Sequence, residues 1–110
     1  MHNNCGVNPE NGFSSFSKFK RVFGKAGEGK EWHHIVEQSQ IGKSGFDPKM
    51  IHNMDNMIAL DRNMHRRVTA IYNSVLNDTE GMTLRNLLAG QSFEVQYQRG
   101  IEVLKSIGAL

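Results

Sequence analysis

Two adjacent histidines, His33 and His34, near the end of a short apolar segment constrain the fold of this chain more than any other feature. Residues 31–36 follow a glycine-rich turn and precede a polar run over residues 37–45, which is the pattern of a β-strand between two loops. Neighbouring side chains of a regular strand point to opposite faces, so both histidines can serve one site only if the strand bends or ends there. We therefore expect the histidine pair at the exit of a strand.

A second strand and an amphipathic helix are predicted after the polar loop. Residues 57–60 form a short apolar strand, and Asp61 is placed to cap a helix that runs to about residue 74. His65 lies in this helix on a face next to the apolar stripe, so it is expected beside the core rather than inside it. The stripe consists of Met64, Val68, Ile71 and Val75.

Hydrophobic periodicity and capping residues predict further helices. They cover residues 14–23, a single turn after Asp47, residues 83–88 and residues 92–107. Two short strands among several helices indicate the α+β class. Residues 1–12 show no periodicity, so we interpret residues 1–18 as a flexible lead-in or the edge of a fragment, and residues 19–110 as one domain.

The composition excludes several classes of protein. A chain of 110 residues is one small domain. No apolar run approaches the roughly 20 residues of a membrane span, or the core of a signal peptide, so we expect neither. Cys5 is the only cysteine, which excludes an internal disulfide and a zinc site built from several thiolates.

Positive charge is unevenly distributed, although the net charge is only +2. Lysine and arginine crowd residues 18–30, and Arg62, Arg66 and Arg67 crowd the predicted helix. Such clusters can bind phosphate, and Arg66 and Arg67 are the phosphate-binding candidates because they follow His65 directly. A solvated basic surface is the alternative.

The histidines suit phosphodiester hydrolysis, which requires a nucleophilic water and stabilisation of charge on the phosphate and the leaving oxygen. A neutral imidazole can accept the proton of the water, typically accelerating a reaction about 10²- to 10⁴-fold. A divalent cation can stabilise the charge. We assign His34 as the proton acceptor, His33 and His65 as metal ligands, and Asn56 as the residue whose amide supports the loop between the strands.

These residues resemble the HNH/endonuclease VII superfamily, also called His-Me finger or ββα-metal nucleases, and in particular its Trp-His-His toxin branch. The similarity covers about residues 19–75 and is clearest at residues 23–29, 32–38, 51–60 and 64–74, which look like C-terminal domains of contact-dependent inhibition and Rhs polymorphic toxins. The resemblance implies a small ββα-metal core covered by additional helices. It places the metal ligands at His33 and His65, the general base at His34 and the structural asparagine at Asn56.

One position departs from the family pattern. Colicin-type members carry another histidine one helical turn after the first helix ligand, where this chain has Thr69. Two imidazoles would then share the cation with water and substrate phosphate, which suits Mg²⁺ or Mn²⁺ while Zn²⁺ or Ni²⁺ can also occupy the site. Asp61 either lends a carboxylate or only caps the helix. Glu37 either orients His34, lies near the metal or is simply exposed.

The resemblance implies a DNA endonuclease that acts as the toxin domain of an interbacterial competition system. Such a domain is secreted or displayed on the cell surface within a larger toxin and acts in the cytoplasm of the target cell. It also implies a cognate immunity protein with an acidic face. Two alternatives stay open: an RNase or tRNase of the same superfamily, because phosphate chemistry does not distinguish DNA from RNA, and a non-catalytic nucleic-acid-binding module with a structural zinc.

Overall fold

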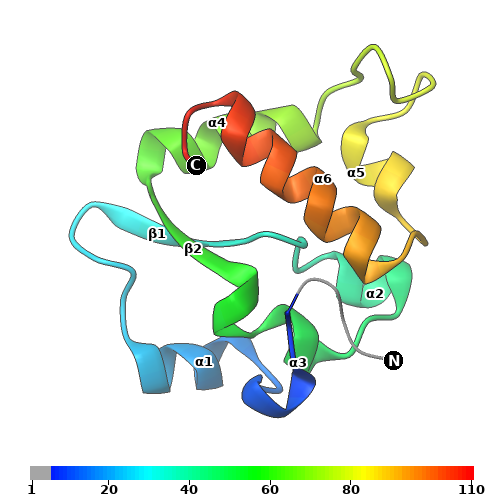
Figure 1. The fold of residues 1–110 in the computed structure, drawn as a ribbon. Helices are drawn as coiled ribbons and strands as arrows, with labels where there is room; N and C mark the ends of the chain where they lie inside the picture. The colour runs from blue at the N-terminus through cyan, green and yellow to red at the C-terminus, as the bar shows by residue number, and fades with distance from the viewer. Residues whose placement is uncertain (1–5) are drawn as a thin grey trace.

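A two-stranded antiparallel sheet forms the middle of the structure, a computed structural model that describes residues 6–110 (Figure 1). Strand β1 (Lys30–His34) pairs with β2 (Met57–Asp61) so that His34 lies opposite Met57. Helix α4 (Arg62–Tyr72) begins at the next residue and packs against both strands. Helices surround this small sheet, so the protein has the α+β class predicted from its sequence.

Five further α-helices and two 3₁₀ turns complete the described part of the chain. Most of the α-helices begin after a side chain that accepts a backbone N–H of the first turn, which satisfies a donor that the helix leaves unpaired. These caps are Ser15, Asp47, Asp61, Thr83 and Ser92. The remaining elements are η1 (Pro9–Asn11), α1 (Phe16–Phe23), α2 (Gln40–Ser44), α3 (Pro48–Ile51), η2 (Met54–Asn56), α5 (Leu84–Leu88) and α6 (Phe93–Ser106).

Strand β1 ends at His34, two residues earlier than the apolar pattern predicts. Ile35 and Val36 are apolar because each enters a core, not because they continue the strand. Ile35 belongs to the larger cluster of buried side chains and Val36 to a smaller one. The histidine pair therefore sits where the chain leaves the sheet, as the alternation of strand side chains requires for a shared site.

The larger core lies among α4, α5 and α6. Its buried members are Ile35, Leu60, Val68, Tyr72, Leu84, Leu88, Val103, Leu104 and Ile107. The smaller core consists of Val7, Val36, Ile51 and Phe93. Burial of these side chains is the main force that holds the helices against the short sheet, because a two-stranded hairpin alone is only marginally stable in water.

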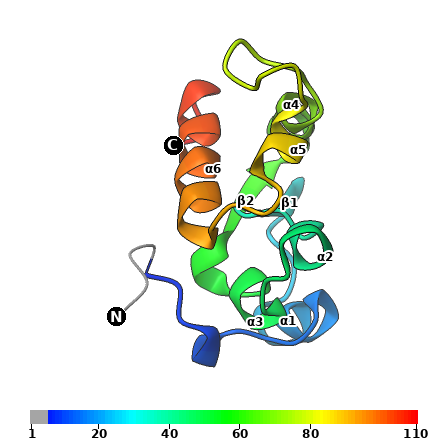
Figure 2. The same cartoon turned by 90° about the vertical axis from the view of Figure 1, so that its right-hand side faces the viewer.

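Helix α6 covers one face of the hairpin, and α1 and α2 lie toward the other side (Figure 2). The close approach of α6 depends on Gly100, because a Cβ atom there would lie 2.6 Å from the carbonyl oxygen of Ile35. The hydroxyl of Tyr72 in α4 donates to the same carbonyl oxygen at 3.4 Å. Two helices therefore hold the backbone immediately after the histidine pair.

The described residues before α1 pack against the rest of the chain rather than extending from it. Val7 is only 1% exposed, and the backbone N–H of Phe13 donates to the carbonyl of His52 at 2.9 Å. The boundary expected at residue 18 thus does not coincide with a break in packing. The part of the lead-in over residues 1–5, with His2 and Cys5, lies outside the described residues.

Two details of the helices differ from the sequence analysis. Helix α4 ends at Tyr72, which is buried, whereas Val75 of the predicted stripe lies beyond the helix and is 60% exposed. Helix α2 falls in the run that was predicted to be a loop, and its Gln40 is buried.

None of the helices within residues 6–110 is long and apolar enough to cross a membrane.

We predict that Gly100→Ala lowers the free energy of unfolding by roughly 1–3 kcal/mol, because the added methyl group overpacks the contact with Ile35. Gly42→Ala in α2 is the matched control, since a Cβ atom there meets nothing within 4 Å. Alanine in place of a helical glycine should stabilise by about 0.5–1 kcal/mol. Urea unfolding of both variants measures the difference, and an unchanged midpoint for Gly100→Ala would contradict the close packing.

Candidate functional site

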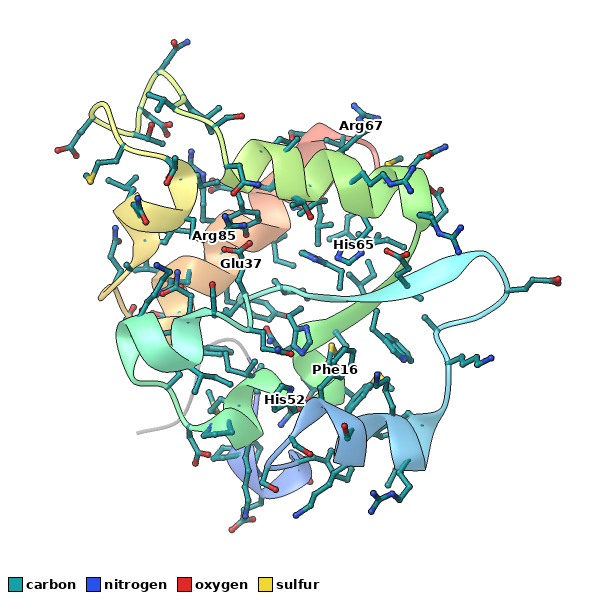
Figure 3. The ribbon with its side chains drawn as sticks, turned by 180° about the vertical axis from the view of Figure 1, so that it is seen from behind. Phe16, Glu37, His52, His65, Arg67 and Arg85 are labelled. Carbon is teal, nitrogen blue, oxygen red and sulfur yellow. The ribbon has the colours of Figure 1, made fainter. Side chains whose placement is uncertain are left out.

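A pocket of about 390 Å³ opens between the end of β1, helix α4 and helix α5. Figure 3, seen from behind Figure 1, shows His65, Glu37 and Arg85 on this side of the molecule. The side chains around it that matter for chemistry are His33, His34, Glu37, His65, Thr69 and Arg85. The structure therefore gathers all three histidines of the predicted site around one opening.

His33 and His65 lie side by side, with ring centroids 5.4 Å apart. The ring of His33 is 5% exposed, and its Nε2 atom is enclosed without a hydrogen-bond partner among the described residues. Burial lowers the pKa of His33 to about 4, so the imidazole is neutral at physiological pH. A buried polar atom without a partner destabilises a fold unless something else binds it.

Glu31 fixes the orientation of His65. The Nδ1 atom of His65 lies 2.7 Å from a carboxylate oxygen of Glu31, and Arg62 contacts the other carboxylate oxygen at 3.3 Å. The hydrogen bond to His65 keeps the pKa of the Glu31 carboxyl below its usual value. Because a carboxylate only accepts hydrogen bonds, Nδ1 of His65 carries the proton of this contact, which leaves Nε2 as the nitrogen available to another partner.

His34 lines the pocket and also contacts a fourth histidine. Its Nε2 atom lies 3.2 Å from Nδ1 of His52. The ring of Phe16 packs edge-on against the ring of His34, with centroids 4.8 Å apart. Burial is the largest of the effects that lower the pKa of His34 to about 3. The ring is therefore neutral at physiological pH.

Asn56 supports the chain after the histidines, as its position in the sequence led us to expect. Its side-chain oxygen accepts from the backbone N–H of Val36 at 2.9 Å, and its amide nitrogen donates to the carbonyl of Val36 at 3.1 Å. The same amide nitrogen donates to the carbonyl of Ile51 at 3.0 Å. Asn56 thus joins the exit of β1 to the end of α3 and to the entry of β2.

Glu37 and Arg85 form a two-pronged ion pair in the wall of the pocket. The Nε and one terminal nitrogen of Arg85 donate to the two carboxylate oxygens of Glu37 at 2.8 and 2.6 Å. Arg85 also donates to the side-chain oxygen of Asn73 at the end of α4. Glu37 is therefore neither simply exposed nor hydrogen-bonded to His34, and it positions a guanidinium group beside the histidines.

The other predicted residues lie away from this pocket. The side chain of Asp61 accepts the backbone N–H of Met64 at 2.8 Å, so it caps α4. Arg66 and Arg67 are exposed and border a separate surface depression, and Figure 3 shows Arg67 on the side of α4 that faces away from His65. A phosphate bound at the histidines would not reach this side of the helix.

Sequence reasoning missed three residues of the site: Glu31, His52 and Arg85. Glu31 is separated from His33 by one residue, so it shares a strand face with it, and this alternation could have indicated its contact with His65. His52 directly follows the one-turn helix α3, and Arg85 lies in α5, where no spacing rule connects either of them to the pair. Their contacts arise only from packing.

The donors around the pocket suit a cation held by few protein ligands. Within residues 6–110, no group of three or more His, Cys, Asp or Glu side chains is arranged to hold a metal ion. A cation bound at about 2.1 Å to one nitrogen of each ring would set two imidazole centroids roughly 5 Å apart, which the spacing of His33 and His65 matches. The unpartnered Nε2 of His33 and the free Nε2 of His65 are thus a fitting pair of ligands.

The chain was compared with protein-family models, with curated proteins and with solved structures. None of the three comparisons found a match. The resemblance to the Trp-His-His nucleases therefore stays an interpretation of the sequence alone.

We predict that the metal-free protein loses stability as the pH falls below about 6.5. The pKa values of His33 and His34 are about 4 and about 3 in the folded protein against 6.5 in a free imidazole, so the unfolded chain binds protons first. Protonation of these two histidines in the unfolded chain lowers the free energy of unfolding below pH 6.5. The loss grows as the pH falls and levels off below the folded pKa values. Urea unfolding in EDTA between pH 8 and 4 measures this dependence.

The variant His33→Leu tests the same prediction with one titrating group removed. We expect a shallower loss of stability with falling pH and, at pH 7, a free energy of unfolding about 1 kcal/mol or more above that of the original chain, because an unsatisfied buried group is gone. A variant that is less stable at pH 7, or that keeps the full acid dependence, would show that Nε2 of His33 is satisfied in the folded protein.

Proposed function

We propose that this protein is a metal-dependent endonuclease in which β1, β2 and α4 form a ββα-metal unit. The observation that carries the proposal is the enclosed, unpartnered Nε2 of His33 beside the ring of His65, in a pocket that also contains His34. The order of hairpin and helix and the Trp-His-His pattern support it. DNA is the proposed substrate on the basis of the family resemblance.

His33 and His65 would hold the cation, and Glu31 would orient His65 from behind. Carboxylate to histidine to metal is a common arrangement, in which the outer carboxylate fixes the ring and raises its basicity. A bound divalent ion, Mg²⁺ or Mn²⁺ in the working enzyme, would stabilise negative charge on the phosphate and on the leaving oxygen. Water and phosphate oxygens would fill the remaining positions.

His34 is the proposed proton acceptor. Its neutral ring takes a proton from water, the water oxygen forms a bond to phosphorus, and the bond from phosphorus to the 3′ oxygen breaks, with solvent returning a proton to the leaving group. The burial that keeps His34 neutral also makes it a weak base in the empty pocket. A bound phosphate adds negative charge nearby and raises the proton affinity of the ring.

Arg85 is the cationic side chain of the pocket wall. Glu37 and Asn73 fix its plane and occupy three of its five N–H donors, and the remaining donors can bind a phosphate oxygen. We propose that Arg85 takes the phosphate-binding role that the sequence analysis assigned to Arg66 and Arg67. The latter two can still contact more distant phosphates of a long substrate.

The resemblance also underlies the proposed biological setting, a toxin domain delivered into a competing bacterium and blocked by an immunity protein. An RNase of the same superfamily is the second candidate, because phosphate chemistry does not itself distinguish DNA from RNA. A structural zinc module is less favoured, since structural zinc sites usually have four ligands and the described residues provide no such group.

Cleavage of supercoiled plasmid and of total tRNA, each with Mg²⁺, Mn²⁺ or EDTA, tests the function directly. We expect nicking of the plasmid that EDTA abolishes. His34→Ala should reduce the rate at least about 100-fold while Mn²⁺ binding persists, because only the proton acceptor is lost. His65→Ala should reduce both, and His2→Ala serves as the control histidine. Cleavage of tRNA alone would favour the RNase. Full activity of the His34→Ala variant would exclude His34 as the base.

Glu31 offers a test of the metal site that does not depend on activity. We predict that Glu31→Ala weakens Mn²⁺ binding about 10- to 100-fold, since the ring of His65 loses the acceptor that orients it. Glu31→Gln retains a neutral acceptor and should lose less, and Glu28→Gln in the preceding turn is the control. Calorimetric titration with Mn²⁺ measures the effect, and wild-type affinity in Glu31→Ala would remove Glu31 from the site.

A further inference from the structure

The contact between His34 and His52 selects which nitrogen of His34 can react. The two rings meet through Nε2 of His34 and Nδ1 of His52 at 3.2 Å, and both side chains are at least 91% buried, with exposures of 9% and 5%. Between two neutral imidazoles, one nitrogen must donate and the other must accept. The position of one proton therefore decides the chemistry of both rings.

Only one of the two arrangements leaves His34 able to act as a base. If Nδ1 of His52 donates, Nε2 of His34 uses its lone pair for that bond and Nδ1 of His34 carries the proton, so the ring has no free lone pair. If Nε2 of His34 donates instead, its Nδ1 is unprotonated. That Nδ1 makes no hydrogen bond to any residue of the described chain, and the ring borders the pocket.

We propose that His52 is a positioning residue that accepts the Nε2 proton of His34 and so leaves the Nδ1 lone pair of His34 free to deprotonate water. This inference rests on the proposed nuclease function, because it specifies how the proton acceptor of that reaction is prepared. His52 itself gains and loses no proton. When His34 takes a proton at Nδ1, its Nε2–H continues to donate to His52.

The surroundings hold both rings in this arrangement. Phe16 lies parallel to the ring of His52, with centroids 6.0 Å apart, and packs edge-on against His34. The backbone of His52 is fixed on both sides, because its N–H donates to Pro48 and its carbonyl accepts from Phe13. Figure 3 shows Phe16 and His52 together beneath the strand that carries the histidine pair.

A side chain with a merely structural role would not be expected to act through the tautomer of its neighbour. Nitrogen-15 NMR of the histidine rings distinguishes the two neutral tautomers, and metal-free protein at pH 7.5 avoids any effect of a bound ion. In the wild type we expect His34 protonated at Nε2. In His52→Ala we expect a mixture of tautomers or a shift to the Nδ1–H form, and in His52→Asn the side-chain oxygen should restore the wild-type form.

Substitution of His52 should also change the rate of plasmid cleavage, because it changes the tautomer of His34. His52→Ala should lower kcat for plasmid cleavage about 10- to 100-fold, in the range typical of residues that orient an active group, with KM and Mn²⁺ affinity unchanged. His52→Asn should recover most of kcat, whereas His52→Phe, which fills the space without an acceptor, should not. Circular dichroism and thermal unfolding verify that each variant is folded.

Each outcome supports or overturns the inference. An Nδ1-protonated His34 in the wild type, or full kcat in His52→Ala with an unchanged tautomer, overturns it. If His52→Ala does not fold, the wild-type tautomer and the contrast between Asn and Phe decide. Absence of cleavage by the wild type overturns the proposed function itself, whereas cleavage that needs His34 but not His52 overturns only the role of His52.

Discussion

The buried amide of Asn56 holds the chain at the place where the sheet, the two cores and the pocket meet. Asn56 is 0% exposed, its side chain pairs with both backbone groups of Val36, and its own carbonyl accepts the N–H of Ile35 at 2.8 Å. These bonds replace the ladder that would have continued β1. The strand can therefore stop at His34 without leaving buried backbone groups unpaired, which would cost about 1–3 kcal/mol each.

Because the strand stops at His34, the two histidines have different surroundings. His33 remains within the ladder and lies against His65 of α4, while His34 is at the end of the strand and contacts His52 and Phe16. Among residues 6–110, the ring of His33 has a nitrogen without a partner, and the ring of His34 has a partner for only one nitrogen. The arrangement is unfavourable for stability and favourable for binding a cation and a proton, as is common where a fold carries chemistry.

Most helices and strands and the three central histidines could be predicted from the sequence. The contacts that orient these histidines could not. His33, His34, His65 and Asn56 could be placed because residue type and local pattern connect each of them to a strand end or a first helical turn. The end of β1 was missed because Ile35 and Val36 look the same in a strand and in a core. His52 and Arg85 were missed because their partners lie far away in the chain, and only packing brings them together.

The contact between Gly100 and the chain after the histidines has a consequence for the order in which the candidate site forms during synthesis. Every residue of the candidate site precedes α6 in the chain, yet the backbone that follows the histidines is held partly by that helix. The ribosome therefore releases the residues of the candidate site before it releases the helix that helps to hold them. During synthesis the histidine segment therefore reaches its final packing only after α6 has left the exit tunnel and docked, so the complete pocket forms late.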